Sequence, residues 1–190
     1  MKYLNISAAM LACSVVSLTP SIAQDPTQVT GALSSTDAGV SPITGQSATD
    51  YVTASTDGDL YEIASSRLAL SKTKNPNIKS FARQMISDHT TSAKSVDAAL
   101  VNSDRKITKP SPKMSNANAS KIELLKKAPK GSFDQLYMQQ QEQAHQVAWS
   151  IQKGYVLNGS DPALRQVAST TLPVIERHIV SLKGSHTGGM

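Results

Sequence analysis

The sequence is poor in cysteine and in aromatic side chains. Among 190 residues there is one cysteine, Cys13, with two Phe, one Trp and five Tyr. A single cysteine cannot form an intramolecular disulfide, so a disulfide scaffold is excluded. The core must consist mainly of Ala, Leu, Ile, Val and Met, a mixture that suits helices packed side by side better than a β-sandwich.

Several enzyme signatures are missing as well. The sequence contains no Gly-x-Ser-x-Gly elbow and no glycine-rich phosphate loop. Its one cysteine falls inside the expected leader, so the mature chain would have no thiol nucleophile. Hydrolase chemistry therefore has no support, and we favour a protein that is not an enzyme.

Long apolar runs are absent except at the N-terminus, where Ile6–Leu18 follows the basic residue Lys2. This run, at ~13 residues against the ~20 that span a bilayer, is typical of a secretory signal peptide. We expect cleavage after Ala23, which makes residues 1–23 the signal, the mature protein soluble and its location periplasmic or envelope-associated. Lipidation at Cys13 is the alternative.

Residues 24–46 are rich in Pro, Gly, Ser, Thr and Asp and have no helical period, so we expect a flexible linker. Beyond them, apolar residues recur with the spacing of amphipathic helices. The expected helices comprise residues 47–72, 75–101, 132–157 and 161–183. Residues 184–190 are expected to form a disordered tail.

Local signals place the ends of these helices. Asn75-Pro76 and Asp161-Pro162 are typical helix starts, and residues 132–135 have the form of a capping box. Asn158-Gly159 is typical of a helix end, and Pro173 should kink the last helix. Because two of the connections are very short, we predict an all-α, up-down four-helix bundle of two antiparallel hairpins.

The hairpins are expected to be joined by a long crossover over residues 102–132 with one short helix near 117–127. From Arg105 to Lys130 there are eight basic residues and one acid, Glu123, a net charge of +7. Such a segment could bind an anionic envelope polymer. Nucleic acid is not expected as a partner, because the segment lacks interleaved aromatic side chains that stack on bases. The oligomeric state is left open.

Histidines and acids interrupt the apolar stripes. Glu62 and His89 lie ~18 and ~22 Å from the first hairpin turn, and His145 and His178 lie ~22 and ~27 Å from the second. If both turns are at the same end, the four side chains share one layer. Glu142 and His145 also have the Glu-x-x-His spacing of di-iron bundles.

Three interpretations of these residues stay open. The first is a structural polar layer in which the histidines are hydrogen-bonded. The second is a mononuclear site for a transition metal such as Zn, Fe or Cu, and the third is oxidative di-metal chemistry. Glu142 and His145 lie beside the apolar stripe of their helix and could face solvent. Met85, Met114 and Met138 could bind copper, although the spacing of Met85 first indicates a core residue.

Several short motifs resemble the exported bacterial proteins with domain of unknown function 4142. These motifs occur between residues 47 and 182 as Gly58–Ile63, Asn75-Pro76, Lys79–Ala82, Met85–His89, Phe133–Tyr137, Ala144–Gln146 and Leu172–His178. Asp59 and Ala64 depart from the family pattern, and Ala64 removes an acid. The resemblance implies export and a ferritin-like bundle but no settled activity. The alternative function that we keep open is a ferritin-like metal-dependent oxidase or peroxide-handling enzyme. The family's label as a predicted outer membrane protein conflicts with the lack of strand patterns.

Overall fold

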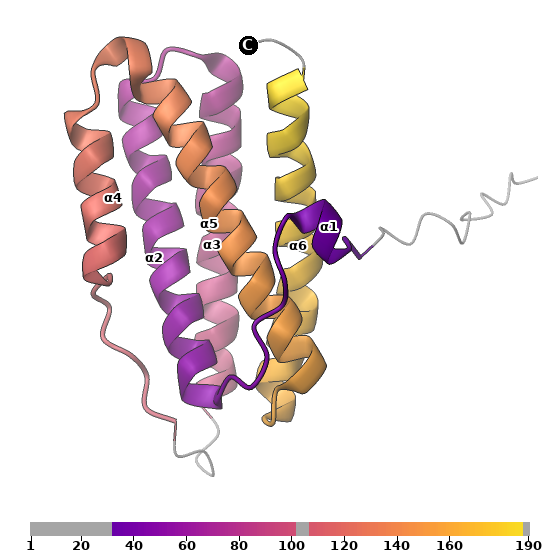
Figure 1. Ribbon diagram of the computed structural model, residues 1–190. Helices are drawn as coiled ribbons and strands as arrows, with labels where there is room; N and C mark the ends of the chain where they lie inside the picture. The colour runs from indigo at the N-terminus through magenta and orange to yellow at the C-terminus, as the bar shows by residue number, and fades with distance from the viewer. Residues whose placement is uncertain (1–31, 102–106, 188–190) are drawn as a thin grey trace, which may run out of the picture. The chain divides into compact units, whose positions relative to one another are not determined.

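The computed structural model describes residues 32–101 and 107–187, and these are all-helical (Figure 1). The expected fold class is therefore confirmed at the level of an all-α protein. No strand occurs within the two described ranges. The helices that they contain are α1 Ser35–Ala38, α2 Ala48–Lys72, α3 Pro76–Leu100, α4 Asn116–Lys127, α5 Lys130–Asn158 and α6 Pro162–Thr187.

Four long helices form the body of the domain. α2 packs on α3 and α5, and α6 packs on α5 and α3, which closes a ring of four helices. In Figure 1, α2 and α6 run upward and α3 and α5 run downward, so neighbours in the ring are antiparallel. The two hairpin turns consequently lie at opposite ends. α4 runs along α2 and carries the chain from the end of α3 back to the start of α5.

Most helix ends follow from local capping. Ser47 and Asp50 form a capping box at the start of α2, and the Asn75 side chain accepts from two amides at the start of α3, where Pro76 is the first residue. The capping box expected at Ser132 is wrong. α5 begins two residues earlier, at Lys130, and the Ser132 hydroxyl donates to the carbonyl of Pro129 instead.

The expectation of a flexible linker is corrected for residues 32–46. Ala38 in α1 is fully buried, the Leu33 amide donates to Glu176 Oε1 at 2.9 Å, and the Ile43 amide donates to the Ser150 carbonyl at 3.0 Å. Backbone bonds, the buried Ala38 and the partly buried Leu33 and Val40 hold this segment on α5 and α6. Such contacts leave no hydrophobic period in the sequence.

Of the expectations about the two ends of the chain, some can be compared with the structure and others cannot. α6 extends to Thr187, so residues 184–187 are helical and not part of a disordered tail. Pro173 lies inside α6, as expected. The proposed signal peptide, its cleavage site and the alternative lipidation site lie outside the described residues. In the part of the chain that the structure covers, no helix has both the length and the apolar character needed to cross a membrane.

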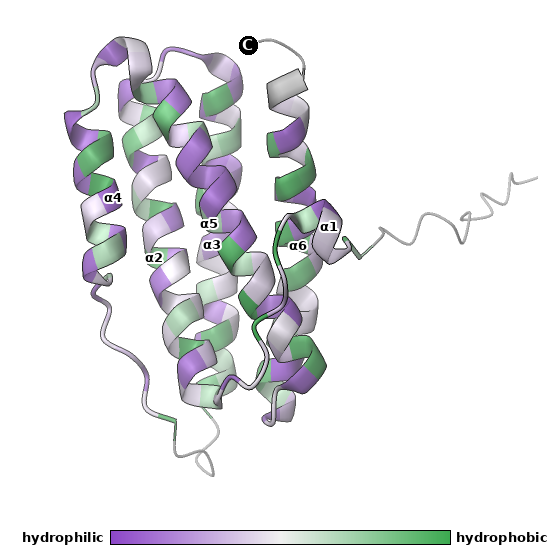
Figure 2. Ribbon diagram, in the orientation of Figure 1, coloured by the Kyte–Doolittle hydropathy of each residue, from purple (hydrophilic) through white to green (hydrophobic). Residues whose placement is uncertain are grey.

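Apolar side chains gather toward the two ends of the bundle. One cluster contains Tyr51, Val96 and Tyr155, and another contains Ile78 and Phe133. Figure 2 shows hydrophobic and hydrophilic residues alternating along each long helix, as expected when one face of a helix is buried. A third apolar cluster includes Trp149 and Ile175, and near the middle of the long helices a group of buried polar residues lies beside it. This group contains the candidate site.

Candidate metal centre

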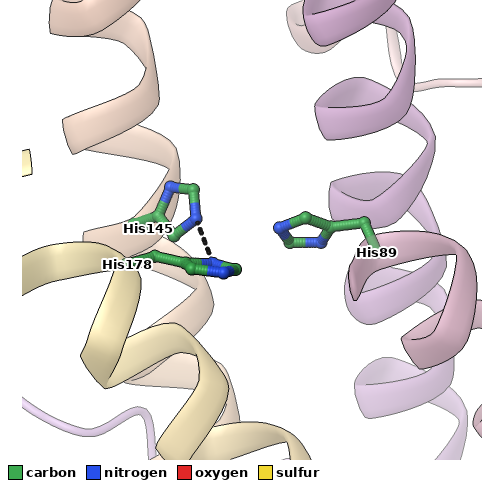
Figure 3. A group of neighbouring side chains, drawn as sticks. All are labelled: His89, His145 and His178. Carbon is green, nitrogen blue, oxygen red and sulfur yellow. Dashed lines mark hydrogen bonds between the residues drawn. The ribbon is translucent and has the colours of Figure 1, made fainter. Parts of the chain in front are cut away.

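Three histidines from three helices meet inside the bundle. His89 on α3, His145 on α5 and His178 on α6 are each at most 5% exposed. One ring nitrogen from each lies within 4.8 Å of the other two. Figure 3 shows the ring of His89 pointing toward the rings of His145 and His178 from the opposite side. No other group of three His, Cys, Asp or Glu residues with converging ligand atoms occurs among the described residues.

The other nitrogen of each ring has an oxygen partner. His89 Nδ1 lies 2.8 Å from Asp59 Oδ1, and His178 Nε2 lies 2.9 Å from Asp88 Oδ2. His145 Nδ1 lies 2.8 Å from the backbone carbonyl of Gln141. Ionised carboxylates and carbonyls only accept hydrogen bonds, so each of these nitrogens must carry the proton. In neutral rings the lone pairs are then on His89 Nε2, His145 Nε2 and His178 Nδ1.

These lone pairs face one another without a donor between them. His145 Nε2 and His178 Nδ1 are 3.1 Å apart, and His89 Nε2 is buried with no hydrogen-bond partner. A hydrogen bond between the two rings requires that one of them carry a second proton. Two nitrogens bound to one tetrahedral zinc ion at 2.0–2.1 Å would be ~3.3 Å apart. The observed separation therefore fits a shared cation as well as a shared proton.

Electrostatics disfavour the extra proton on these two rings. Burial, assisted by the charges of the other histidines, holds the pKa of His145 well below its ordinary value. Burial also lowers the pKa of His178 to about 4, despite the hydrogen bond to Asp88. At neutral pH both rings are neutral. Because the metal ligand is the neutral imidazole, these values favour cation binding.

His89 has the opposite tendency. Burial opposes its protonation, but the hydrogen bond to Asp59 and the negative charge of Glu62 outweigh this and raise its pKa. Burial in turn raises the pKa of Asp59, and it raises that of Glu62 to about 7. A divalent cation on the inner nitrogens would take the place of a second proton on His89 and would favour ionisation of the two neighbouring carboxyls.

Three of the five residues predicted from the sequence to bind a metal converge in the structure, and two do not. His89, His145 and His178 converge, and Glu62 Oε1 lies 3.8 Å from His145 Nδ1, on the ring edge that faces Gln141. Glu62 is therefore next to the cluster but outside the converging group. Glu142 is half-buried and is also outside that group. The suggestion that His145 could face solvent is wrong, because the side chain is fully buried.

Asp59, Asp88 and Gln141 complete the site and were missed from the sequence. Each holds a ring nitrogen and so fixes the orientation and tautomer of a histidine, as the outer partners of metal ligands do. One signal existed for Asp59, which precedes Glu62 by three residues and therefore lies on the same face of α2. The Asp88 contact joins α3 to α6, and no sequence spacing reveals it.

The methionines and the basic segment occupy other places. Met85 and Met138 are buried and line a groove between α3 and α6 together with His178, whereas Met114 is absent from that lining. Of the basic segment, Lys109 and Lys126 pair with exposed acids, and Arg105 lies outside the described residues. Binding of an anionic polymer stays a prediction.

Three converging imidazoles with one open position can hold a transition metal ion. Comparison with known families gives a match over residues 32–183 to the model described as domain of unknown function (DUF4142). The chain belongs to this family. The match begins at residue 32, so the DUF4142 domain includes the segment that packs on α5 and α6 before α2. Comparisons with curated proteins and with solved structures gave no match.

Proposed function

We propose that this DUF4142 protein is an exported cell-envelope protein whose helical domain binds one transition metal ion through His89, His145 and His178. Export is supported by the basic start and the short apolar run of residues 1–23. Metal binding is supported by the lone pairs that face each other across 3.1 Å, which carries the proposal. A purely structural polar layer would place a donor opposite an acceptor there.

The donor set favours a single ion over a di-metal centre. Di-iron bundles use two Glu-x-x-His pairs and further carboxylates. Here the one such pair is Glu142 and His145, and only the histidine belongs to the converging group. Three imidazoles suit Zn²⁺, Cu²⁺ and Fe²⁺. We also propose that the two hairpins and the crossover that runs the length of the bundle are a ferritin-like arrangement.

The experiment is metal binding by purified protein in solution. Protein stripped with chelator is titrated with Zn²⁺ and with Co²⁺, and the expected result is about one ion per chain. The double variant His89→Ala/His178→Ala should lose this binding. His186→Ala is the matched control, because it removes the one histidine of the sequence that is not among the three proposed ligands. Failure of the wild-type protein to bind either ion would refute the proposal.

A second measurement uses the residues that hold the outer nitrogens of the histidine rings. Asp59→Asn keeps the volume of the side chain that holds His89 but removes its charge. Loss of such a partner typically weakens metal affinity about 10- to 100-fold. An unchanged affinity in Asp59→Asn would show that His89 does not bind the ion through its other nitrogen.

A metal-dependent oxidase or peroxide-handling enzyme is the second candidate. It is favoured by a partly enclosed cavity of about 180 Å³ whose lining includes His89, Glu62 and Asp59. Three protein ligands with an open fourth position are typical of catalytic metal sites. Faster oxidation of Fe²⁺ or decomposition of peroxide by the wild-type protein than by the double histidine variant would support this function.

A further inference from the structure

The charges of the domain are unevenly distributed along the bundle. The α2–α3 turn and the α4–α5 connection lie at the same end, the upper end in Figure 1. Residues 66–83 and 121–137, which form this end, contain nine basic and two acidic residues, a formal net charge of +7. The other described residues contain seven basic and ten acidic residues, a net charge of −3. We call residues 66–83 and 121–137 together the basic end.

Contacts between the two stretches make the basic end one surface. Lys72 Nζ donates to the carbonyls of Leu125 and Lys126, at 3.0 and 2.6 Å, where α4 ends. The Thr73 hydroxyl donates to Asp134 Oδ2 at 2.9 Å. Side chains from both stretches also share one apolar cluster. Five of the nine basic residues precede the crossover, so the charge pattern of the crossover alone does not reveal this surface.

Most of the positive charge at this end faces solvent. Six basic side chains are exposed: Arg67, Lys74, Arg83, Lys126, Lys127 and Lys130. The two acids are already engaged, because Glu123 pairs with Lys126 at 2.8 Å and Asp134 accepts from Thr73. Within the described part of the chain, Lys74, Lys127 and Lys130 have no acidic partner. The basic end therefore attracts anionic groups, and the rest of the domain does not.

The type and the placement of the cations favour an extended partner over a compact anion. Seven of the nine basic residues are lysines, which act as separate, flexible point charges. Sites for a single phosphate or carboxylate favour the two-pronged hydrogen bonding of arginine. The exposed cations come from α2, α3, α4, α5 and the α2–α3 turn. A broad anionic surface contacts more of them at once than a small anion does.

The neighbouring side chains favour lipid over a hydrophilic polymer. Leu124 is 57% exposed, and Lys127 follows it by three residues on the same face of α4. An apolar side chain among basic ones is typical of a surface that contacts the headgroup region of a bilayer. Nucleic acid would be bound through exposed aromatic rings, whereas Phe133 and Tyr137 of this end are buried.

We infer that the basic end docks on the surface of a bilayer that contains anionic phospholipids. The bundle stands on the membrane by this end, because the remaining part of the domain has a net negative charge and is repelled. The proposed export would bring the protein to such a surface. The interaction does not involve the histidine cluster, so it is independent of the proposed metal binding.

The test is cosedimentation with vesicles, using protein purified from cells that express the full chain. Vesicles of phosphatidylglycerol mixed with phosphatidylcholine should bind the protein at least about tenfold more tightly than phosphatidylcholine alone. The Debye length falls from about 10 Å at 0.1 M salt to about 3 Å at 1 M, so this preference should disappear at the higher salt concentration.

Two triple variants with the same change of net charge locate the surface. Lys74→Gln/Lys127→Gln/Lys130→Gln removes three exposed cations from the basic end. Each lysine near an anionic membrane strengthens binding roughly fivefold, so this variant should bind the anionic vesicles on the order of 100-fold more weakly.

The matched control is Lys94→Gln/Lys113→Gln/Lys153→Gln, which removes three cations outside the basic end. It should bind the anionic vesicles as the wild type does. Thermal unfolding checks that both variants fold, and the salt dependence of the wild-type protein tests the inference without any variant.

Several outcomes would overturn the inference. These are equal binding to anionic and neutral vesicles, binding that 1 M salt leaves unchanged, and an equal loss of binding in the two triple variants. Retention on heparin that depends on Lys74, Lys127 and Lys130, without binding to anionic vesicles, would also overturn it and would assign the basic end to a polymer. A wild-type protein that binds the vesicles but no Co²⁺ would refute the proposed metal site alone.

Discussion

Glu62→Gln should stabilise the metal-free protein at alkaline pH. Glu62 is 3% exposed, both of its carboxylate oxygens lack a hydrogen-bond partner, and burial raises its pKa to about 7 from an ordinary value of 4.5. Glutamine has nearly the same shape but no charge to bury. The substitution therefore removes the cost of ionisation and keeps the volume of the side chain.

The pKa change gives the size and the pH dependence of the effect. One pKa unit corresponds to about 1.4 kcal/mol, so full ionisation of the buried carboxyl costs roughly 3 kcal/mol. Below pH 4.5 the carboxyl is protonated in both states and the cost is absent. Between pH 4.5 and 7 the unfolded chain loses this proton while the folded protein keeps it, so wild-type stability falls as pH rises. Well above pH 7 the carboxyl is ionised in both the folded and the unfolded states, and the folded wild-type protein bears the full cost of the buried charge.

The assay is denaturant unfolding in the presence of a chelator at pH 4.5 and at pH 8. We expect Glu62→Gln to exceed the wild type by roughly 3 kcal/mol at pH 8 and by little at pH 4.5. Glu123→Gln, at an exposed acid, is the control and should leave the stability at pH 8 close to that of the wild type. If Glu62→Gln is no more stable than the wild type at pH 8, Glu62 is not an unpaired buried carboxylate.

Three further predictions concern the metal and the packing. Zn²⁺ at 100 times its Kd should stabilise the protein by about 2.7 kcal/mol, which raises Tm by roughly 5–11 °C, and the double histidine variant should show no rise. Gly154→Ala should lower the free energy of unfolding by about 1–3 kcal/mol, because the new Cβ would lie 1.8 Å from the Ile43 carbonyl oxygen. Gly58 has open space around it, so Gly58→Ala should raise the free energy of unfolding by about 1 kcal/mol in the same denaturant assay. Asp57→Ala removes the acceptor for the residues that begin α4 and should lower stability by about 1–3 kcal/mol, measured by thermal unfolding.

The local elements of the fold could be predicted because their signals are local. Ser47 and Asn75 cap their helices through side chains that bond to amides two or three residues away, and α4 begins within one residue of the expected position. Where the deciding contact is distant, prediction failed. Residues 32–46 lie on α5 and α6 through backbone bonds to partners more than 100 residues away, such as Ser150 and Glu176.

The candidate site, too, could be predicted only where its signals are local. His89, His145 and His178 each lie near the middle of a long helix, so packing brings them to one level even though the hairpin turns are at opposite ends. The condition that both turns share an end was therefore unnecessary. Glu142 follows the spacing of a known metal motif, yet spacing along one helix does not determine whether a side chain joins a group formed by three helices.

The sequence by itself determined where the four long helices lie, to within a few residues at their ends, and at what height along each helix the histidines lie, because capping and periodicity act over a few residues. Only the tertiary structure decided how each helix is rotated about its axis, and thereby that Asp59, Asp88 and the Gln141 carbonyl take the outer nitrogens of the three rings. That rotation is set by packing against two or more neighbouring helices at once. It is what leaves the inner nitrogens facing one another, free to bind a cation.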